Sequence, residues 1–224
     1  KGDWIVRKDV YVRYQTKEEL KTGGLSIGYT GYGGKHHIGP EFQLGHSLGD
    51  GFEEPVLLIK TAWGGKSLNK DFRPPSAGGE SGEFYQKMIN EFREDLAKIE
   101  NEFPYLAELE PVLGGFVWFQ GWNDIYDEAA RKNYQTNLIC LINDIRKDVK
   151  QFDLPVVIGE LGNGGLDVNE NMLSIRMAQK GAAELLGANA VFVSTAQFAR
   201  KAKDSPNVGH GHHWFGNAES YFFI

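Results

Sequence analysis

The sequence holds one cysteine, no excess of basic residues and no long apolar run, and each of these absences excludes a class of protein. The single Cys140 excludes an intrachain disulfide. With 24 Lys and Arg against 30 Asp and Glu, the net charge of −6 gives no basic stripe for a nucleic-acid backbone. The longest stretch without Asp, Glu, Lys or Arg, residues 185–199, is too short to cross a bilayer. Neither nucleic acid nor a membrane is therefore an expected partner.

What the sequence does contain is enough apolar and aromatic material for a sizeable core. Hydrophobic residues make up 41% of the chain and aromatic residues 12%, which excludes a disordered protein. A length of 224 residues suits one larger α/β domain, so we expect residues 1–224 to form a single domain.

Four apolar runs predict buried strands, and three amphipathic patterns between them predict helices. The strands are expected at residues 56–59, 112–119, 154–158 and 190–194, and the helices at 82–100, 128–150 and 168–186. Residues 10–14 alternate like an exposed strand. Strands that alternate with long helices indicate right-handed crossovers in a mostly parallel sheet. Glycine-rich loops close the first three of the four runs, and ligand chemistry is expected there, at the carboxyl ends of the strands.

Residues 45–49, Gly-His-Ser-Leu-Gly, match the Gly-x-Ser-x-Gly nucleophile elbow of α/β-hydrolases, with Ser47 as the nucleophile and His213 downstream. An elbow needs a strand before the serine and a helix after it. Here Pro40-Glu41 predicts a helix start, and the segment after residue 51 predicts a strand. The order is reversed, which favours a helical residue with glycine-rich packing over a nucleophile.

Two of the glycine-rich loops carry groups that could stabilise a negative charge. Residues 64–67, Gly-Gly-Lys-Ser, end like a phosphate-binding loop, but the first glycine of that motif is replaced by Lys60. As a turn after a strand, the same loop offers backbone N–H groups to an oxyanion. Asn123, in the loop after the next strand, could donate from its amide, although an isolated residue of this kind is more often part of a local turn.

The run His210-Gly211-His212-His213-Trp214 could be a metal cluster, a general base or a solvated loop. Zinc needs three or four ligands, and no His-Glu-x-x-His motif or cysteine pair accompanies the run. One imidazole acting on a hydroxyl needs far less. We therefore expect no metal and favour a base.

Four blocks of sequence stand out together. They are residues 38–41 (IGPE), 60–68 (KTAWGGKSL), 116–124 (FVWFQGWND) and 213–221 (HWFGNAESY). In this order they resemble the sialate O-acetylesterase-like carbohydrate esterases, which belong to the SGNH hydrolases. The resemblance implies a three-layer α/β/α, flavodoxin-like domain with a mostly parallel sheet. It also implies hydrolysis of acetyl esters on carbohydrates, with no metal or organic cofactor.

The resemblance assigns roles to three residues of this chain. Gly65 matches the glycine whose backbone N–H donates to the oxyanion, and Asn123 matches the asparagine whose side-chain amide does the same. His213 matches the base, and His212 is the alternative. The family has an aspartate three residues before the base, but that position is His210 here, and Asp204 is a distant substitute.

The family's nucleophile has no counterpart, because no Gln-Ser-Asn triplet occurs in the 224 residues. In the family this motif lies upstream of the region matching residue 1. We therefore expect a fragment, truncated at both ends and inactive alone, of a secreted or periplasmic enzyme. A sheet without the family's first strand should have a gap or exposed edges at an inner position, unless a strand from residues 1–30 fills it.

Two alternatives to an esterase of this family stay open. One is an α/β-hydrolase that uses Ser47. The other is a non-catalytic carbohydrate-binding module whose tryptophans stack on sugars. The tryptophans concerned are Trp63, Trp118, Trp122 and Trp214.

Overall fold

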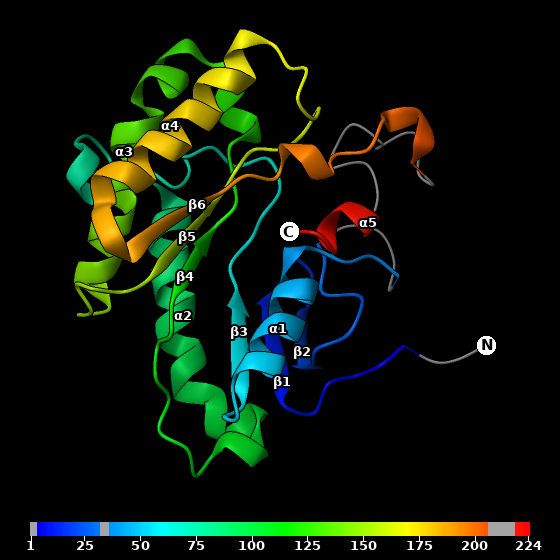
Figure 1. Ribbon diagram of the computed structural model, residues 1–224. Coiled ribbons are helices and arrows are strands. Elements are labelled where there is room, and N and C mark those ends of the chain that lie inside the picture. The colour runs from blue at the N-terminus through cyan, green and yellow to red at the C-terminus, as the bar shows by residue number, and fades with distance from the viewer. Residues whose placement is uncertain (1–3, 32–35, 206–217) are drawn as a thin grey trace. The chain divides into compact units, whose positions relative to one another are not determined.

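The computed structural model describes residues 4–31, 36–205 and 218–224, with side chains from Ser220 in the last range, and the chain forms two compact units (Figure 1). Unit 1 contains Lys1–Gly64, Glu91–Pro111 and Arg200–Ile224, and unit 2 contains Gly65–Asn90 and Val112–Ala199. Helix α2 (Glu83–Glu102) contributes its first part to unit 2 and its last part to unit 1. No helix of the described residues is long and apolar enough to span a membrane.

Unit 1 is built on a three-stranded sheet with the order β2-β1-β3. Strand β1 (Val10–Gln15) pairs antiparallel with β2 (Leu20–Gly24) and parallel with β3 (Val56–Lys60). Within the described residues this sheet has no gap at its inner position, because β1, from the first 30 residues, is its central strand, and β2 and β3 are its edges. The expectation of exposed edges stays a prediction.

The expectation that residues 10–14 form an exposed strand is also wrong. Val10, Val12 and Tyr14 are buried on one face of β1. On the other face Arg13 is buried as well, because its guanidinium pairs with Asp95 and, at 2.6 Å, with Glu102, both on α2. The sequence pattern of alternating apolar and polar residues predicts one exposed face. That prediction fails here because the polar residue is buried against partners that are distant in the sequence.

Helix α1 (Pro40–Gly51) begins with proline in its first turn, as predicted, and packs on β1 and β3. Ser47 is an exposed residue within it, so the Gly-x-Ser-x-Gly motif has no strand-to-helix turn. A Cβ added at Gly45 would lie 2.5 Å from Cδ2 of Leu25, and one at Gly49 would clash with Cγ2 of Val10. The two glycines let the helix lie close to the sheet, which explains the motif without a nucleophile.

Unit 2 is built on a parallel sheet with the order β4-β5-β6. Its strands are β4 (Phe116–Trp118), β5 (Val156–Gly159) and β6 (Ala190–Val193), and its long helices are α3 (Glu128–Asp148) and α4 (Glu170–Leu186). The two helices pack on each other, and α4 also packs on β5 and β6 (Figure 1).

The predicted helices and strands of unit 2 lie within a few residues of the observed ones, except at the start of β4. Residues 112–115 are not in the strand, and Val112 is exposed. The ladder between β4 and β5 begins at Phe116, whose N–H donates to the carbonyl of Pro155. Because the partner strand begins only after this proline, the apolar residues before Phe116 have nothing to pair with.

Short 3₁₀ helices complete the two units. They are η1 (Pro75–Ala77), η3 (Trp122–Tyr126), η4 (Gly187–Asn189) and η5 (Ala196–Phe198) in unit 2, and η2 (Pro104–Leu106) and η6 (Ala202–Asp204) in unit 1, where α5 (Ala218–Tyr221) also lies. Helix η3 follows β4 directly and carries Asn123 and Asp124, so the end of this strand positions both side chains.

Candidate functional site

The loop that opens unit 2 presents the backbone N–H of Gly65. Gly65 is exposed and has φ +75°, a conformation that favours glycine, although a Cβ there would meet no atom within 4 Å. Its N–H makes no hydrogen bond to any residue in the described part of the chain. The geometry of the backbone, and not lack of space, therefore accounts for glycine here, and the N–H is available to a ligand.

A buried carboxylate fixes this loop to the loop after β4. Asp124 is fully buried, and its two oxygens accept from the backbone N–H groups of Leu68 at 2.9 Å and Asn69 at 3.0 Å. The side chain of Gln120 donates to the same carboxylate at 2.7 Å. Desolvation raises the pKa of Asp124, while these donors act in the opposite direction.

The amide of Asn123 lies beside the Gly65 loop. Its Nδ2 donates to the carbonyl of Lys66 at 3.2 Å, and Nε2 of Gln120 donates to the same carbonyl at 2.9 Å. Asn123 is thus not a local turn residue. An amide nitrogen carries two hydrogens, and within the described residues Asn123 uses only one. The structure places the amide of Asn123 against the loop that carries Gly65, so the two predicted oxyanion donors lie in loops that are hydrogen-bonded to each other.

Ser67, in the same loop, is engaged with Asp71. The Ser67 hydroxyl donates to Oδ2 of Asp71 at 3.0 Å and accepts from the N–H of Lys70 at 3.2 Å. Burial raises the pKa of Asp71, but the hydrogen bonds from Ser67 and the ammonium of Lys66 outweigh it, so the pKa is lowered overall. Ser67 therefore stabilises the turn.

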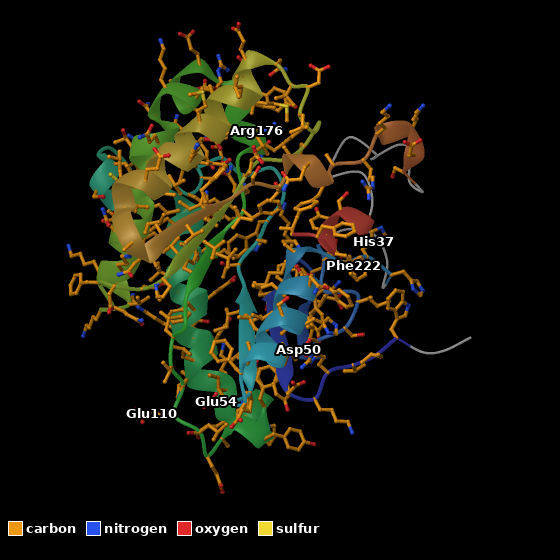
Figure 2. The ribbon with its side chains drawn as sticks, in the orientation of Figure 1. His37, Asp50, Glu54, Glu110, Arg176 and Phe222 are labelled. Carbon is orange, nitrogen blue, oxygen red and sulfur yellow. The ribbon has the colours of Figure 1, made fainter. Side chains whose placement is uncertain are left out.

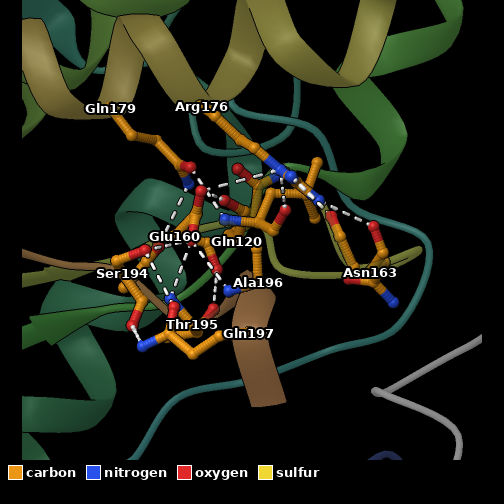
Figure 3. Close-up of polar contacts among 12 residues, drawn as sticks. Gln120, Glu160, Asn163, Arg176, Gln179, Ser194, Thr195, Ala196 and Gln197 are labelled. Carbon is orange, nitrogen blue, oxygen red and sulfur yellow. Dashed lines mark hydrogen bonds and ion pairs between the residues drawn. The ribbon is translucent and has the colours of Figure 1, made fainter. Parts of the chain in front are cut away.

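A second polar cluster, made of Glu160, Arg176 and the backbone around them, fastens the ends of β5 and β6 (Figure 3). Glu160 follows β5, and its Oε2 accepts from Ser194 Oγ at 2.9 Å and from the N–H groups of Thr195 and Ala196 at 2.7 and 2.8 Å. Arg176 lies 3.8 Å from the other carboxylate oxygen. The carboxylate of Glu160 therefore binds groups of the protein itself.

Arg176 projects from α4 and holds the loop after β5 (Figures 2 and 3). Its guanidinium donates to the carbonyls of Leu161 at 2.6 Å, Gly165 at 2.8 Å and Asn163 at 2.9 Å. Burial lowers the pKa of Arg176, and the charge of Glu160 acts in the opposite direction. Gln179, one turn further along α4, is fully buried and bonds the loops after both β4 and β5.

The sequence prediction did not include Asp124, Glu160 or Arg176 among the site residues. For the two carboxylates a signal was present, since each follows a predicted buried strand directly or within its closing loop. For Arg176 there was none, because an arginine within an amphipathic helix does not reveal which carbonyls it will bind.

The histidine run, residues 210–214, lies outside the described residues, so the base assigned to His213 stays a prediction. Asp204 is exposed at the end of η6. The described residues contain no group of three or more His, Cys, Asp or Glu that could share a metal ion.

The sequence pattern of one protein family, described as "Carbohydrate esterase, sialic acid-specific acetylesterase", matches residues 14–217, which is most of the chain. The chain belongs to this family of carbohydrate esterases. No match was found among curated protein sequences.

Two solved structures resemble this esterase domain and support the fold. One is a protein from Arabidopsis thaliana, with 18% identity and a TM-score of 0.58 over 87% of this chain and 69% of that protein. The other is a carbohydrate acetylesterase from Xanthomonas citri, with 15% identity and a TM-score of 0.59 over 87% of this chain. The chain spans only 44% of the length of the second protein. With the parallel strands and long helices, these likenesses confirm the predicted α/β fold.

The alternative of a sugar-stacking module loses two of its four tryptophans, while Trp122 is half-buried. Trp63 and Trp118 are buried, and the indole N–H of Trp118 donates to the hydroxyl of Tyr134 at 3.2 Å. Trp214 lies outside the described residues. Buried tryptophans belong to the core and cannot stack on a sugar.

We expect Asp124→Ala to destabilise the esterase domain by about 1 to 3 kcal/mol, because the buried N–H of Leu68 and that of Asn69 lose their acceptor. The midpoint of urea unfolding measures this loss. Asp124→Asn keeps one acceptor oxygen and should lie between the wild type and the alanine variant. Equal midpoints for all three proteins would show that Asp124 does not anchor the Gly65 loop.

Proposed function

We propose that this chain supplies the oxyanion site and the base of an esterase that removes acetyl groups from carbohydrates. The observation that carries the proposal is that the amide of Asn123 and the carboxylate of Asp124 both bind the loop that carries the N–H of Gly65. Two donors fixed in advance are what a developing oxyanion needs. Membership of a carbohydrate esterase family supports the substrate class.

The reaction has two steps. A serine hydroxyl attacks the acetyl carbonyl and His213 takes its proton, while the N–H of Gly65 and the amide of Asn123 donate to the oxyanion of the tetrahedral intermediate. The intermediate collapses, the sugar oxygen leaves with the proton from His213, and an acetyl-enzyme remains. Water, deprotonated by His213, then attacks the acetyl carbon and releases acetate, and the proton returns to the serine.

The nucleophilic serine lies outside the 224 residues in this proposal. The chain has no Gln-Ser-Asn triplet, Ser47 lies within α1, and Ser67 donates to Asp71. In this proposal the three groups meet a serine from another segment of the full-length protein. Release of acetate from O-acetylated sugars by the full-length protein is the direct test of the activity.

A fluorophosphonate probe tests the nucleophile, because it reacts with a serine only where a base and an oxyanion site converge. We expect no labelled residue by mass spectrometry in the 224-residue chain and one labelled serine, outside these residues, in the full-length protein. Labelling of Ser47 that His213→Ala abolishes would support an α/β-hydrolase instead. Labelling of Ser67 would show that the Gly65 loop has another role.

A further inference from the structure

The loop after β5 is held in one conformation although it is rich in glycine. Gly164 and Gly165 have φ +80° and +73°, which a residue with a side chain rarely adopts. The guanidinium of Arg176 binds three carbonyls of the loop, including that of Asn163. Because the backbone is fixed from within unit 2, the side chains that it carries are also held in place.

The side chain of Asn163 has no protein partner within the described residues. Asn163 is only 8% exposed, yet neither its amide nitrogen nor its amide oxygen makes a hydrogen bond to a described residue. Its amide is not fully enclosed either. Buried polar groups are almost always paired, so an unpaired amide that solvent can still reach indicates a place for a ligand.

The topology puts Asn163 at the same edge of the sheet as Asn123. Strands β4 and β5 are parallel neighbours in which Trp118 lies opposite Ile158. Asn123 and Asn163 follow these two residues at the same distance along the chain. Figure 3 shows Asn163 at the rim of the cluster, on the side away from Glu160 and Ser194. The carboxyl edge of a parallel sheet is where α/β proteins bind their ligands.

We infer that the Asn163 amide binds a hydroxyl group of the sugar that carries the acetyl group, and so contributes to substrate specificity. The inference rests on the esterase function proposed above. An amide both donates and accepts, which matches a sugar hydroxyl, whereas an oxyanion needs donors only. Asn163 is a binding residue for the carbohydrate and takes no part in the acyl transfer.

The test compares two esters in the full-length protein. One substrate is the best-hydrolysed member of a panel of O-acetylated sialic acid, xylose and glucose, and the other is p-nitrophenyl acetate, which has no sugar. We expect Asn163→Ala to raise KM for the acetylated sugar about tenfold with kcat little changed, since a hydrogen bond to the substrate is lost. Turnover of p-nitrophenyl acetate should not change. Asn171→Ala, at an exposed position of α4, is the matched control.

A binding measurement separates this inference from the proposed function. Calorimetric titration with the deacetylated sugar needs no catalysis, and Asn163→Ala should weaken its binding about tenfold. An equal loss of kcat/KM for both esters, or unchanged binding of the sugar, would overturn the inference.

The outcomes also distinguish this inference from the proposed function. If the wild type hydrolyses no ester but the variant binds sugar more weakly than the wild type, only the esterase function fails. If the wild type binds no sugar, both fail. Should the alanine variant not fold, Asn163→Asp, which keeps the shape and loses the donors, takes its place.

Discussion

Asn123→Ala should lower kcat of the full-length esterase about 100- to 1000-fold, because removal of one donor from an oxyanion site typically has this effect. The structure allows the catalytic and structural effects to be separated. Asn123 donates to the Lys66 carbonyl, but that carbonyl keeps its 2.9 Å hydrogen bond from Gln120 when Asn123 is replaced. The loop should therefore stay in place, and the midpoint of urea unfolding should hardly change.

Two further variants make this experiment specific. Asn123→Asp keeps the size of the side chain but has no donor when ionised, so it should be as slow as the alanine variant. Asn133→Ala, at an exposed position of α3, should be as active as the wild type. An Asn123→Ala protein with full kcat would remove Asn123 from the oxyanion site.

The elements of unit 2 could be predicted from the sequence because their signals are local. An apolar run marks each strand, and the period of the apolar residues marks each helix, so α4 was expected at 168–186 and lies at Glu170–Leu186. The cap of α4 is local as well, since Asn169 accepts from the N–H of Met172 at 3.1 Å. The start of β4 was missed because it depends on where the partner strand begins.

The errors in unit 1 have a different cause. A buried charge is stabilised by partners distant in the sequence, and Arg13 finds them in Asp95 and Glu102. On α2 the same contacts go with a buried Asp95, while the neighbouring Leu96 is exposed. A hydrophobic pattern along one helix cannot contain this information.

The candidate site was predictable only in part. Gly65 and Asn123 could be proposed because both follow predicted strands and both match blocks of a known family. The loops of Gly65 and Asn123 are joined by the carboxylate of Asp124, which accepts from the N–H groups of Leu68 and Asn69. These hydrogen bonds connect segments that are distant in the sequence. Every residue except proline has a backbone N–H, so the sequence does not show which of these groups a carboxylate will bind, and only the structure does.

The largest expected effect on stability is that of Arg176→Met. The methionine fills a similar volume, but Glu160, which is 8% exposed, loses its cation, and three loop carbonyls lose their donor. Breaking a buried ion pair from one side typically costs about 3 to 5 kcal/mol. Hydrogen exchange of the amides in β5 should show this loss, because it reports the opening of one part of the protein.

A double variant distinguishes the unpaired charge from the lost hydrogen bonds. In Arg176→Met combined with Glu160→Gln no buried charge is left without a partner, so the double variant should be more stable than Arg176→Met alone. Lys180→Met, at an exposed position of the same helix, should leave the exchange of β5 unchanged and serves as the control. If the double variant instead loses the sum of the two single effects, Glu160 and Arg176 act independently, and the loss in Arg176→Met comes from the three carbonyls that lose their donor.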